Sequence, residues 1–415
     1  MSSRLANVAF PAAKADLCVK CGLCLPHCPT YRETQHEAES PRGRITLMQG
    51  LASGLVPASP TLQAHLDACL GCRACERVCP AQVPYGELID AGRAMSAAAN
   101  GVPGLTRRLA PWLQHRALRA LARLLLRCWQ YSGLQGVLRR SGLLRGRARR
   151  LESLLPAAQT LATPGITPQA PRAAMQNLRV SLFRGCVNDI ADRDTLHAIR
   201  TLFEHCGIGV DEPSMQTCCG ALQQHAGDAD GAARLARTNA DAFADSATPI
   251  VYAASGCGAT LKEYARVGSD VNCTSLASRV REPHQLLLEH WPQDLSLRPL
   301  AAKIAVHLPC TQLNVTGGGD TISALLKKIP QAEVFALDRT QQCCGAAGTY
   351  FVSEAEMADR LLAHKLDALV ALRPDYLVSS NIGCTLHLAA GLARRGLTVP
   401  VLHPLALLAQ QWCDT

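Results

Sequence analysis

The stretch CVKCGLCLPHCP at residues 18–29 is matched in its cysteine spacing by CLGCRACERVCP at residues 69–80. Each stretch has three cysteines separated by two residues, a fourth cysteine after a gap of three, and then a proline. Two-residue gaps allow three thiolates to wrap one face of an iron–sulfur cubane, whereas the fourth thiolate points away beyond the turn. The two stretches therefore predict two [4Fe–4S] clusters, each sharing cysteines from both stretches.

The crossover of the fourth cysteine determines the predicted ligand sets. The first cluster is assigned to Cys18, Cys21, Cys24 and Cys79. The second cluster is assigned to Cys69, Cys72, Cys75 and Cys28. Zinc explains the pattern less well, because zinc ribbons use isolated CxxC pairs. Disulfide frameworks belong to small secreted domains, and this chain has 415 residues.

A second group of cysteines belongs to an internal repeat in the C-terminal part of the chain. Both copies have an apolar run ending in cysteine, then Cys-Cys-Gly, then another such run, with offsets of 124, 125 and 127 residues. Three nearly equal offsets indicate a tandem duplication. The cysteines are Cys186, Cys218, Cys219 and Cys257 in the first half, and Cys310, Cys343, Cys344 and Cys384 in the second.

These repeated cysteines are candidate metal ligands. Loops at the carboxyl ends of parallel strands face one crevice, so the four cysteines of each half can converge there. Glycine after the cysteine pair lets the backbone come close to a metal. Two interpretations stay open: an additional iron–sulfur cluster or other metal in one or both halves, or cysteines that pack as small hydrophobic residues.

Other cysteines and histidines are assigned weaker roles. Three histidines near the repeated cysteines are interpreted as hydrogen-bonded loop residues, with metal ligation or proton donation to a quinone as the alternative: His225, His307 and His387. Four cysteines have no counterpart in the repeat and are interpreted as structural: Cys128, Cys206, Cys273 and Cys413.

The fold class is predicted to be mixed α and α/β, a helical ferredoxin-like domain with two [4Fe–4S] clusters followed by a duplicated α/β CCG domain. Each half of the duplication is expected to read strand, helix, CCG loop, helix, strand, helix. The predicted domains are a di-cluster domain at 1–95, a basic helical connector at 96–176, a first CCG domain at 177–300 and a second at 301–415.

The connector makes the chain basic. The net charge is +9, and twelve arginines with no acidic residue lie between residues 105 and 150, which leaves a net charge of −3 for the rest. Within 105–129, apolar residues form one helical stripe with four arginines beside it: Arg116, Arg119, Arg123 and Arg127. Such a helix can lie on anionic lipid, pack on an acidic partner subunit, or expose a solvated face. Nucleic acid is not expected, because aromatic residues are only 4 %.

The chain shows no secretion or membrane-spanning signal. The first 14 residues lack an apolar run preceded by basic residues, and no run of about 18 uncharged apolar residues occurs. The expected location is the cytoplasm, either free or peripheral on the cytoplasmic face of the inner membrane.

The chain resembles the iron–sulfur subunit of bacterial glycolate oxidase over nearly its whole length. The strings that carry the resemblance are SPRGRI at 40–45, CLGCRAC at 69–75, ASGCGA at 254–259 with KEY at 262–264, CCGAAGTY at 343–350, and NIGC at 381–384. The iron–sulfur subunits of anaerobic glycerol-3-phosphate dehydrogenase and heterodisulfide reductase share the cysteine plan but are less similar between the cysteines. In heterodisulfide reductase each full CCG motif has a fifth cysteine. This chain has Thr260 and His387 at those positions, which puts a five-cysteine cluster in doubt here.

The resemblance implies a complex in which an FAD-containing catalytic subunit oxidises glycolate or D-lactate, together with a further flavin-domain subunit. This chain would pass electrons toward a quinone or other acceptor and would not be catalytic alone, in agreement with the lack of a strand-linked GxGxxG. The alternatives are a heterodisulfide-reductase-like subunit that reduces a thiol or disulfide substrate, the iron–sulfur subunit of a D-lactate or glycerol-3-phosphate dehydrogenase, and a metal-dependent structural adaptor.

Overall fold

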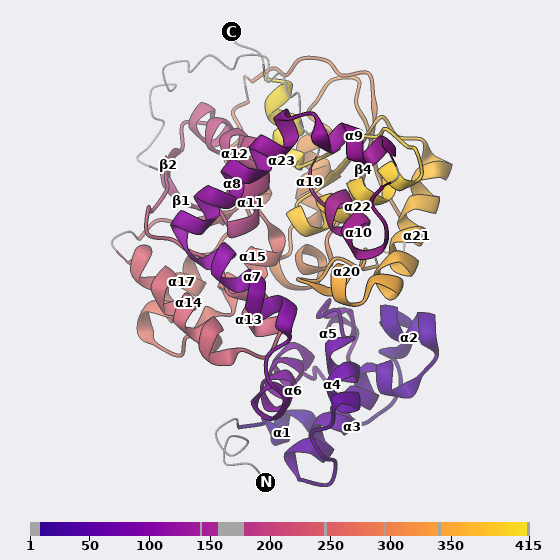
Figure 1. Cartoon of the computed structure of the whole chain (residues 1–415). Helices are drawn as coiled ribbons and strands as arrows, with labels where there is room; N and C mark the ends of the chain where they lie inside the picture. Colours follow the sequence, from indigo (N-terminus) through magenta and orange to yellow (C-terminus); the bar gives the residue numbers. More distant parts are fainter. Residues whose placement is uncertain are drawn as a thin grey trace.

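The computed structural model describes residues 9–141, 143–156, 178–244, 247–293, 295–338 and 342–412. The predictions for Cys413 and for the connector residues 157–176 fall outside these ranges. Figure 1 shows a helical N-terminal part below two α/β units that lie side by side, with the connector helices running across both units.

The N-terminal domain is helical, as expected. Its elements are α1 (Ala12–Ala15), η2 (Leu25–His27), α2 (Pro29–Thr34), η3 (Glu37–Glu39), α3 (Pro41–Ala52), α4 (Pro60–Asp67), α5 (Ala74–Arg77) and α6 (Tyr85–Asn100). Helix α3 begins at Pro41 because the Ser40 side chain caps it, accepting a hydrogen bond from the Gly43 amide. Its buried face joins α4 and α6 in one apolar core that includes Met48, Leu66 and Leu88.

The connector consists of α7 (Gly104–Gln114), α8 (Arg116–Tyr131), α9 (Leu134–Ser141) and α10 (Gly146–Ser153). The prediction of one continuous helix over 105–129 is wrong, since the chain leaves helical geometry at His115, whose backbone is extended. Helices α7 and α8 pack on the first CCG half, and α10 packs on the second.

The first CCG half contains a three-stranded parallel sheet in the order β2-β1-β3. Its elements are β1 (Arg179–Phe183), α11 (Cys186–Ala191), α12 (Arg193–His205), β2 (Gly209–Asp211), α13 (Ala221–His225), α14 (Ala229–Ala242), β3 (Ile250–Tyr252), α15 (Ser255–Lys262), α16 (Tyr264–Val267), α17 (Val271–Arg279) and α18 (Pro283–Glu289).

The second half repeats this arrangement with a four-stranded parallel sheet in the order β5-β4-β6-β7. Its elements are β4 (Lys303–His307), the π-helix η4 (Gln312–Thr316), α19 (Gly319–Leu326), β5 (Glu333–Ala336), α20 (Tyr350–Ser353), α21 (Ala355–Leu372), β6 (Tyr376–Ser379), α22 (Ile382–Arg394), β7 (Val401–Leu402) and α23 (Pro404–Gln410).

The predicted order of elements omits the short edge strands β2 and β5, which precede the Cys-Cys-Gly loops. These strands have only three or four residues, so neither contains enough alternation to be recognised. In both loops the glycine, Gly220 or Gly345, has a φ of +90°, a backbone conformation that favours glycine.

The two halves share one apolar core. Buried residues from β1 and α12 of the first half and from β4, β6 and α23 of the second half form a single cluster that includes Leu182, Leu202, Val306, Val378 and Leu405. The halves are therefore packed together as one unit rather than linked as independent domains.

Candidate metal centres

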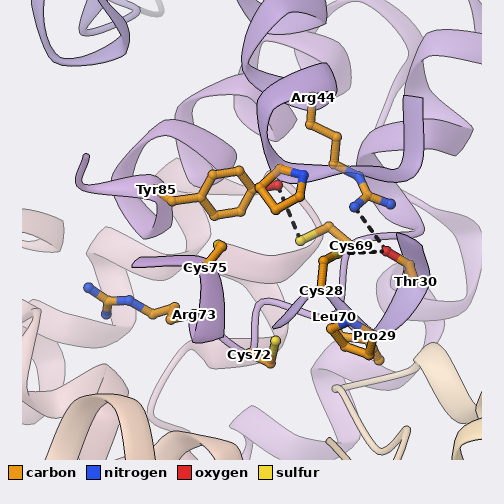
Figure 2. A pocket seen from close by; sticks show the side chains of 11 residues that line it. Cys28, Pro29, Thr30, Arg44, Cys69, Leu70, Cys72, Arg73, Cys75 and Tyr85 are labelled. Atoms are coloured by element: carbon orange, nitrogen blue, oxygen red, sulfur yellow. Dashed lines mark hydrogen bonds between the residues drawn. The ribbon is translucent and has the colours of Figure 1, made fainter. Parts of the chain in front are cut away.

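Four cysteines of the N-terminal domain surround one small cavity. Cys69, Cys72 and Cys75 lie between the end of α4 and the end of α5, and Cys28 lies immediately before α2. The space that they border measures about 300 Å³ including its mouth. Figure 2 shows Cys69 beside Cys28, with Arg44 and Thr30 on one side and Tyr85 on the other. The structure thus brings together the four cysteines that the spacing assigned to the second cluster.

The chemistry of these thiols fits a bound iron–sulfur cluster. Burial raises the pKa values of Cys72 and Cys75 well above the ordinary thiol range, so the free side chains keep their protons. Iron would replace those protons and hold the sulfurs as thiolates. The Tyr85 hydroxyl donates a hydrogen bond to Cys69 Sγ over 3.6 Å, and hydrogen bonds to sulfur tune the potential of such clusters.

A buried arginine stands at the same cavity. Arg44 is 1 % exposed and donates hydrogen bonds to the His65 carbonyl over 2.7 Å and to Thr30 Oγ1 over 3.1 Å. It also pairs with the Glu39 carboxylate. Burial opposes the charge, but acidic groups nearby, Cys69 foremost, raise the pKa of the guanidinium above its usual value. Arg44 therefore places a fixed positive charge beside thiolates. The SPRGRI string contains this arginine, but the sequence alone does not show that its side chain reaches the cysteines.

The ligands assigned to the first cluster belong to the same domain, and Cys24 lies near Cys28 and Cys75 of the second set. Cys18, Cys24 and Cys79 are partly buried and pack against the N-terminal core, whereas Cys21 is exposed. Burial, with a smaller contribution from the neighbouring Cys18 thiol, raises the pKa of Cys24 to about 11. All four thiols lie in the ferredoxin-like domain, and their common grouping remains a prediction.

The cavity at Cys72 adjoins the second CCG half. The Asn314 side chain of η4 donates a hydrogen bond to the Cys72 carbonyl over 2.6 Å. Leu70 packs in one apolar cluster with Cys343 and Tyr350, and Cys72 and Cys310 lie against that cluster. Cysteines separated by more than two hundred positions in the sequence are thus neighbours.

The four cysteines of the second half form a chain of thiols. The Sγ atoms of Cys310 and Cys343 are 4.0 Å apart, and those of Cys344 and Cys384 are 3.1 Å apart. Cys343 and Cys344 are adjacent in sequence and their thiols also interact. The Asn381 amide lies 3.6 Å from Cys384 Sγ. The repeat-based expectation that these side chains converge agrees with this geometry.

The four cysteines of the first half converge as well, but they open onto a large space. Cys186 Sγ and Cys218 Sγ are 3.5 Å apart, and Cys219 interacts with Cys218 and Cys257. Hydrogen bonds from the Cys186 and Cys219 thiols lower the pKa of Cys218. All four side chains line a cavity of about 370 Å³, which lies within the range of common ligand pockets, about 300–1,000 Å³.

The lining of this large cavity comes from all parts of the chain. The Leu70–Gly71 loop and α6 contribute from the N-terminal domain, α7 from the connector, and η4, α20 and α22 from the second half. Most of the lining is apolar, including Ile89, Leu113 and Phe351. We refer to this space as the junction cavity.

Charged residues hold the N-terminal domain at the rim of the junction cavity. Arg73 pairs with Glu263 of the first half, and Arg266 Nη2 contacts Asp90 over 2.8 Å. Burial opposes the charge of Glu263, but Arg73 and Arg266 keep the pKa of this carboxyl below its ordinary value. These ion pairs join domains across the site.

The histidines differ from the sequence-based interpretation. Burial lowers the pKa of His307 to about 3 and that of His387 to about 4, so both imidazoles are neutral near pH 7. His387 Nε2 lies 3.3 Å from the Ala358 carbonyl, and its ring stacks on Phe351. His307, by contrast, lies within ligand distance of two cysteines, Cys344 and Cys384. His225 is partly buried and borders the junction cavity.

The arginine stripe is only partly free. Arg119 is 4 % exposed, donates hydrogen bonds to backbone carbonyls and approaches Asp189 to 3.4 Å, so none of the three alternatives for the stripe (lipid, partner subunit or solvent) holds for this residue. Arg123 also contacts Asp189, over 3.3 Å. Cys273 is fully buried as expected and Cys206 is intermediate, but Cys128 is exposed on α8, so a packing role for Cys128 is wrong.

Comparison with known proteins shows that the chain is one of the iron–sulfur proteins that combine a dicluster domain with a repeated CCG domain. Residues 14–83 match the family described as "4Fe-4S dicluster domain". Residues 180–262 and 304–389 each match the family described as "Cysteine-rich domain". The duplication inferred from the cysteine offsets is confirmed by these two matches.

The chain belongs to the family of glycolate oxidase iron–sulfur subunits. It is 32 % identical to the "Probable glycolate oxidase iron-sulfur subunit" of Bacillus subtilis (strain 168), over 95 % of this chain and 93 % of that protein. It is 31 % identical to the "Glycolate oxidase iron-sulfur subunit" of Escherichia coli (strain K12), over 90 % and 89 %. It is 28 % identical to "Lactate utilization protein A" of Geobacillus kaustophilus, over 54 % of this chain and 96 % of that protein. The resemblance drawn from the motifs is thus confirmed.

Proposed function

We propose that this chain is the electron-transferring subunit of a flavin-dependent 2-hydroxy-acid dehydrogenase that converts glycolate to glyoxylate. The observation that carries the proposal is the cavity bordered by Cys28, Cys69, Cys72 and Cys75, since this crossed set of four thiols is what a second [4Fe–4S] cluster requires. The clusters, when bound, accept and release single electrons. The chain's own residues hold them and, through Arg44 and Tyr85, offset the charge of the thiolates.

The partners follow from the proposed role. An FAD-containing catalytic subunit would oxidise the hydroxy acid, and a further flavin-domain subunit would complete the complex. This chain carries no dinucleotide-binding motif, which supports a role that is not catalytic alone. D-lactate is the alternative substrate of such a complex, because one group of relatives is named for lactate utilisation.

The junction cavity supports a site for the electron acceptor. A quinone-like acceptor needs an apolar space next to a redox centre. Leu70 lines both the cavity of the second cluster and the junction cavity, so the two spaces are adjacent. A second candidate function draws on the same cavity: the four first-half cysteines at its wall would suit reduction of a thiol or disulfide substrate, as in a heterodisulfide-reductase-like subunit.

Peripheral contact with the cytoplasmic face of a membrane is part of the proposal. Among the described residues no helix has the length and apolarity needed to cross a bilayer. The outer sides of α8 and α9 expose Leu124, Leu125 and Val137 by 57 %, 54 % and 62 %, in a segment that has arginines and no acidic residues. Exposed leucines flanked by arginines are typical of surfaces that lie on anionic lipid.

The first test is the cofactor content of protein purified without oxygen. Two [4Fe–4S] clusters correspond to about eight iron and eight acid-labile sulfide per chain, with up to about sixteen of each if both CCG halves hold clusters. Metal without sulfide would contradict electron transfer and leave a structural adaptor.

The second test addresses the crossed ligands. Cys79→Ser is expected to perturb the cluster held by Cys18, Cys21 and Cys24, while Cys28→Ser perturbs the other cluster. Paramagnetic resonance of the reduced protein distinguishes the two clusters. If each variant loses the cluster of its own stretch, the assignment is wrong.

The third test separates acceptor from substrate at the junction cavity. Leu222, which lines the cavity, is replaced by tryptophan, with Leu222→Met as the matched control. In the assembled complex, Leu222→Trp is expected to slow reduction of a soluble quinone analogue at least about tenfold, since a ligand-sized space is filled, while dye-linked hydroxy-acid oxidation persists. Loss of disulfide reduction instead would favour the second candidate.

The fourth test concerns the membrane. Replacing Leu124 and Leu125 with glutamine is expected to move the complex into the soluble fraction, and raised salt should weaken wild-type binding because the Debye length is about 8 Å at physiological ionic strength. Loss of the flavoprotein with retention at the membrane would identify a subunit interface instead.

A further inference from the structure

The strongest unexplained feature of the second CCG half is a buried histidine at its thiols. His307 is the last residue of β4. Its imidazole, Cys344 Sγ and Cys384 Sγ offer ligand atoms that all lie within 4.8 Å of one another. The three side chains are 2 %, 1 % and 2 % exposed. The three donors therefore meet at a site that is shielded from bulk solvent.

The burial of the imidazole leaves one of its two nitrogens without a hydrogen bond in the described part of the chain. That nitrogen is Nε2 of His307. Ser379, which is paired with His307 in the register of β4 and β6, has a hydroxyl in the same condition. A buried polar atom left unpaired costs about 1–3 kcal/mol, so a structure that keeps two side by side is expected to satisfy them with something else.

The repeat shows that this position does not need a histidine for folding. The residue three positions before the first cysteine is Phe183 in the first half and His307 in the second. Phe183 is fully buried at the end of β1 and packs against Phe243, with ring centroids 6.1 Å apart. An apolar ring is thus sufficient for the scaffold, and the imidazole in the second half is best explained by its nitrogen.

The donor set identifies the ligand class. Thiolate sulfur and neutral imidazole nitrogen are the donors of four-coordinate sites for zinc-class divalent ions. Cys343, whose thiol interacts with that of Cys344, lies outside this group of mutually close donors, so three protein ligands would leave one position for water or another small ligand. The buried Lys365–Asp338 ion pair lies near His307 and places a cation close to the thiolates.

We propose that the second CCG half binds a single zinc-class divalent ion through His307, Cys344 and Cys384. The inference rests on the proposed role of the CCG cysteines as metal ligands, but not on the two clusters of the N-terminal domain. His387, which stands where a related family has its fifth cysteine, is not a ligand of this ion. The first half, with Phe183 in place of His307, lacks the nitrogen donor.

The test uses the full-length protein purified without oxygen from medium that contains both iron and zinc. X-ray absorption at the zinc edge is expected to show sulfur at about 2.3 Å and imidazole nitrogen at about 2.0–2.1 Å. Metal analysis is expected to find about one zinc per chain that is not matched by sulfide. A shell of sulfur alone, or the absence of zinc beside intact iron–sulfur clusters, would overturn the proposal.

Two variants locate the nitrogen. His307→Phe installs the residue of the first half and is expected to remove the zinc, while His387→Phe, a buried histidine of the same half, should retain it. His307→Gln is the second variant if the phenylalanine variant does not fold. The reduced spectra of the N-terminal clusters report whether the proposed electron-transfer role survives separately. Zinc retained at full stoichiometry in folded His307→Phe would show that the histidine is only a packing residue.

Discussion

The two CCG halves share a parallel sheet order over three strands and the same four cysteines, but the cysteines of the two halves face different neighbours. In the first half all four line the junction cavity, whereas in the second half Cys310 alone does; each half has one partly buried cysteine, Cys257 or Cys310. In the second half Cys343, Cys344 and Cys384 are buried, and His307 lies among them. The duplication preserved the positions of the sulfurs, while the equivalent neighbouring residue differs: Phe183 in the first half and His307, which has a nitrogen donor, in the second.

The largest expected effect tests whether the halves are one folding unit. Leu405 of α23 is fully buried in the core that both halves share. Leu405→Ala is expected to lower the free energy of unfolding by about 2–5 kcal/mol, because it removes buried methyl groups and leaves a cavity. Urea unfolding followed by tryptophan fluorescence and far-UV circular dichroism should still show coincident transitions. Two separate transitions would mean that the halves are independent.

The second prediction compares access to the thiols in protein stripped of metal. Cys257 at the junction cavity should react with iodoacetamide about a hundredfold faster than Cys384, if access to the buried thiol requires local opening that costs about 2.7 kcal/mol. Mass spectrometry of each cysteine measures the rates. Exposed Cys128 and fully buried Cys273 serve as fast and slow references in the same sample. Equal rates would remove the distinction between the halves.

The third prediction uses the two loop glycines. Gly220 and Gly345 both have a φ of +90°, so alanine at either position should cost about 1–2 kcal/mol of stability. A Cβ at Gly345 would lie 2.7 Å from the Ala358 carbonyl oxygen, whereas at Gly220 the nearest atom, the Ala232 carbonyl oxygen, is 3.4 Å away. Gly345→Ala should therefore be the more destabilising change in urea titrations, and the reverse order would contradict the tighter packing of the second half.

The smallest effect concerns pH and the caps of two equivalent helices. Glu282 caps α18 of the first half, and His403 caps α23 of the second. Burial, and then the adjacent His284, lower the pKa of His403 well below its ordinary value of about 6.5. Below pH 6.5 the unfolded chain binds a proton that the folded chain does not. The free energy of unfolding therefore decreases as the pH is lowered, by up to about 1.4 kcal/mol per pH unit.

His403→Asn keeps a capping side chain and removes the titrating group. The variant should show a flatter loss of stability between about pH 6.5 and pH 5 than the wild type, measured by thermal unfolding across that range. An unchanged pH profile would show that His403 does not control the acid sensitivity of this half.

Much of this arrangement could be predicted from sequence, because it is local or periodic. The two cysteine stretches and the amphipathic helices depend on spacings of a few residues, and the duplication follows from three nearly equal offsets between cysteines. The edge strands β2 and β5 are too short for such a signal.

The rest depends on contacts between distant parts of the chain. The burial of Arg44, the pairing of Arg119 with Asp189 and the meeting of Cys72 with Cys310 are tertiary events that periodicity does not encode. His307 and His387 looked equivalent in sequence, since each stands three residues from a cysteine. The structure separates them, because His307 is at the end of a strand and His387 is inside a helix.

The contact between the Cys72 loop and the second CCG half has a consequence for biosynthesis. Leu70 is covered by residues near Cys343 and Leu361, which leave the ribosome almost three hundred positions later. At about 5–20 residues per second, this delay lasts roughly 15–60 s. During that interval the cysteines of the second cluster would be accessible from a side that is closed in the finished protein. Iron and sulfide delivery would therefore have its easiest access while the chain is still being translated, and a cluster lost afterwards would be slow to replace.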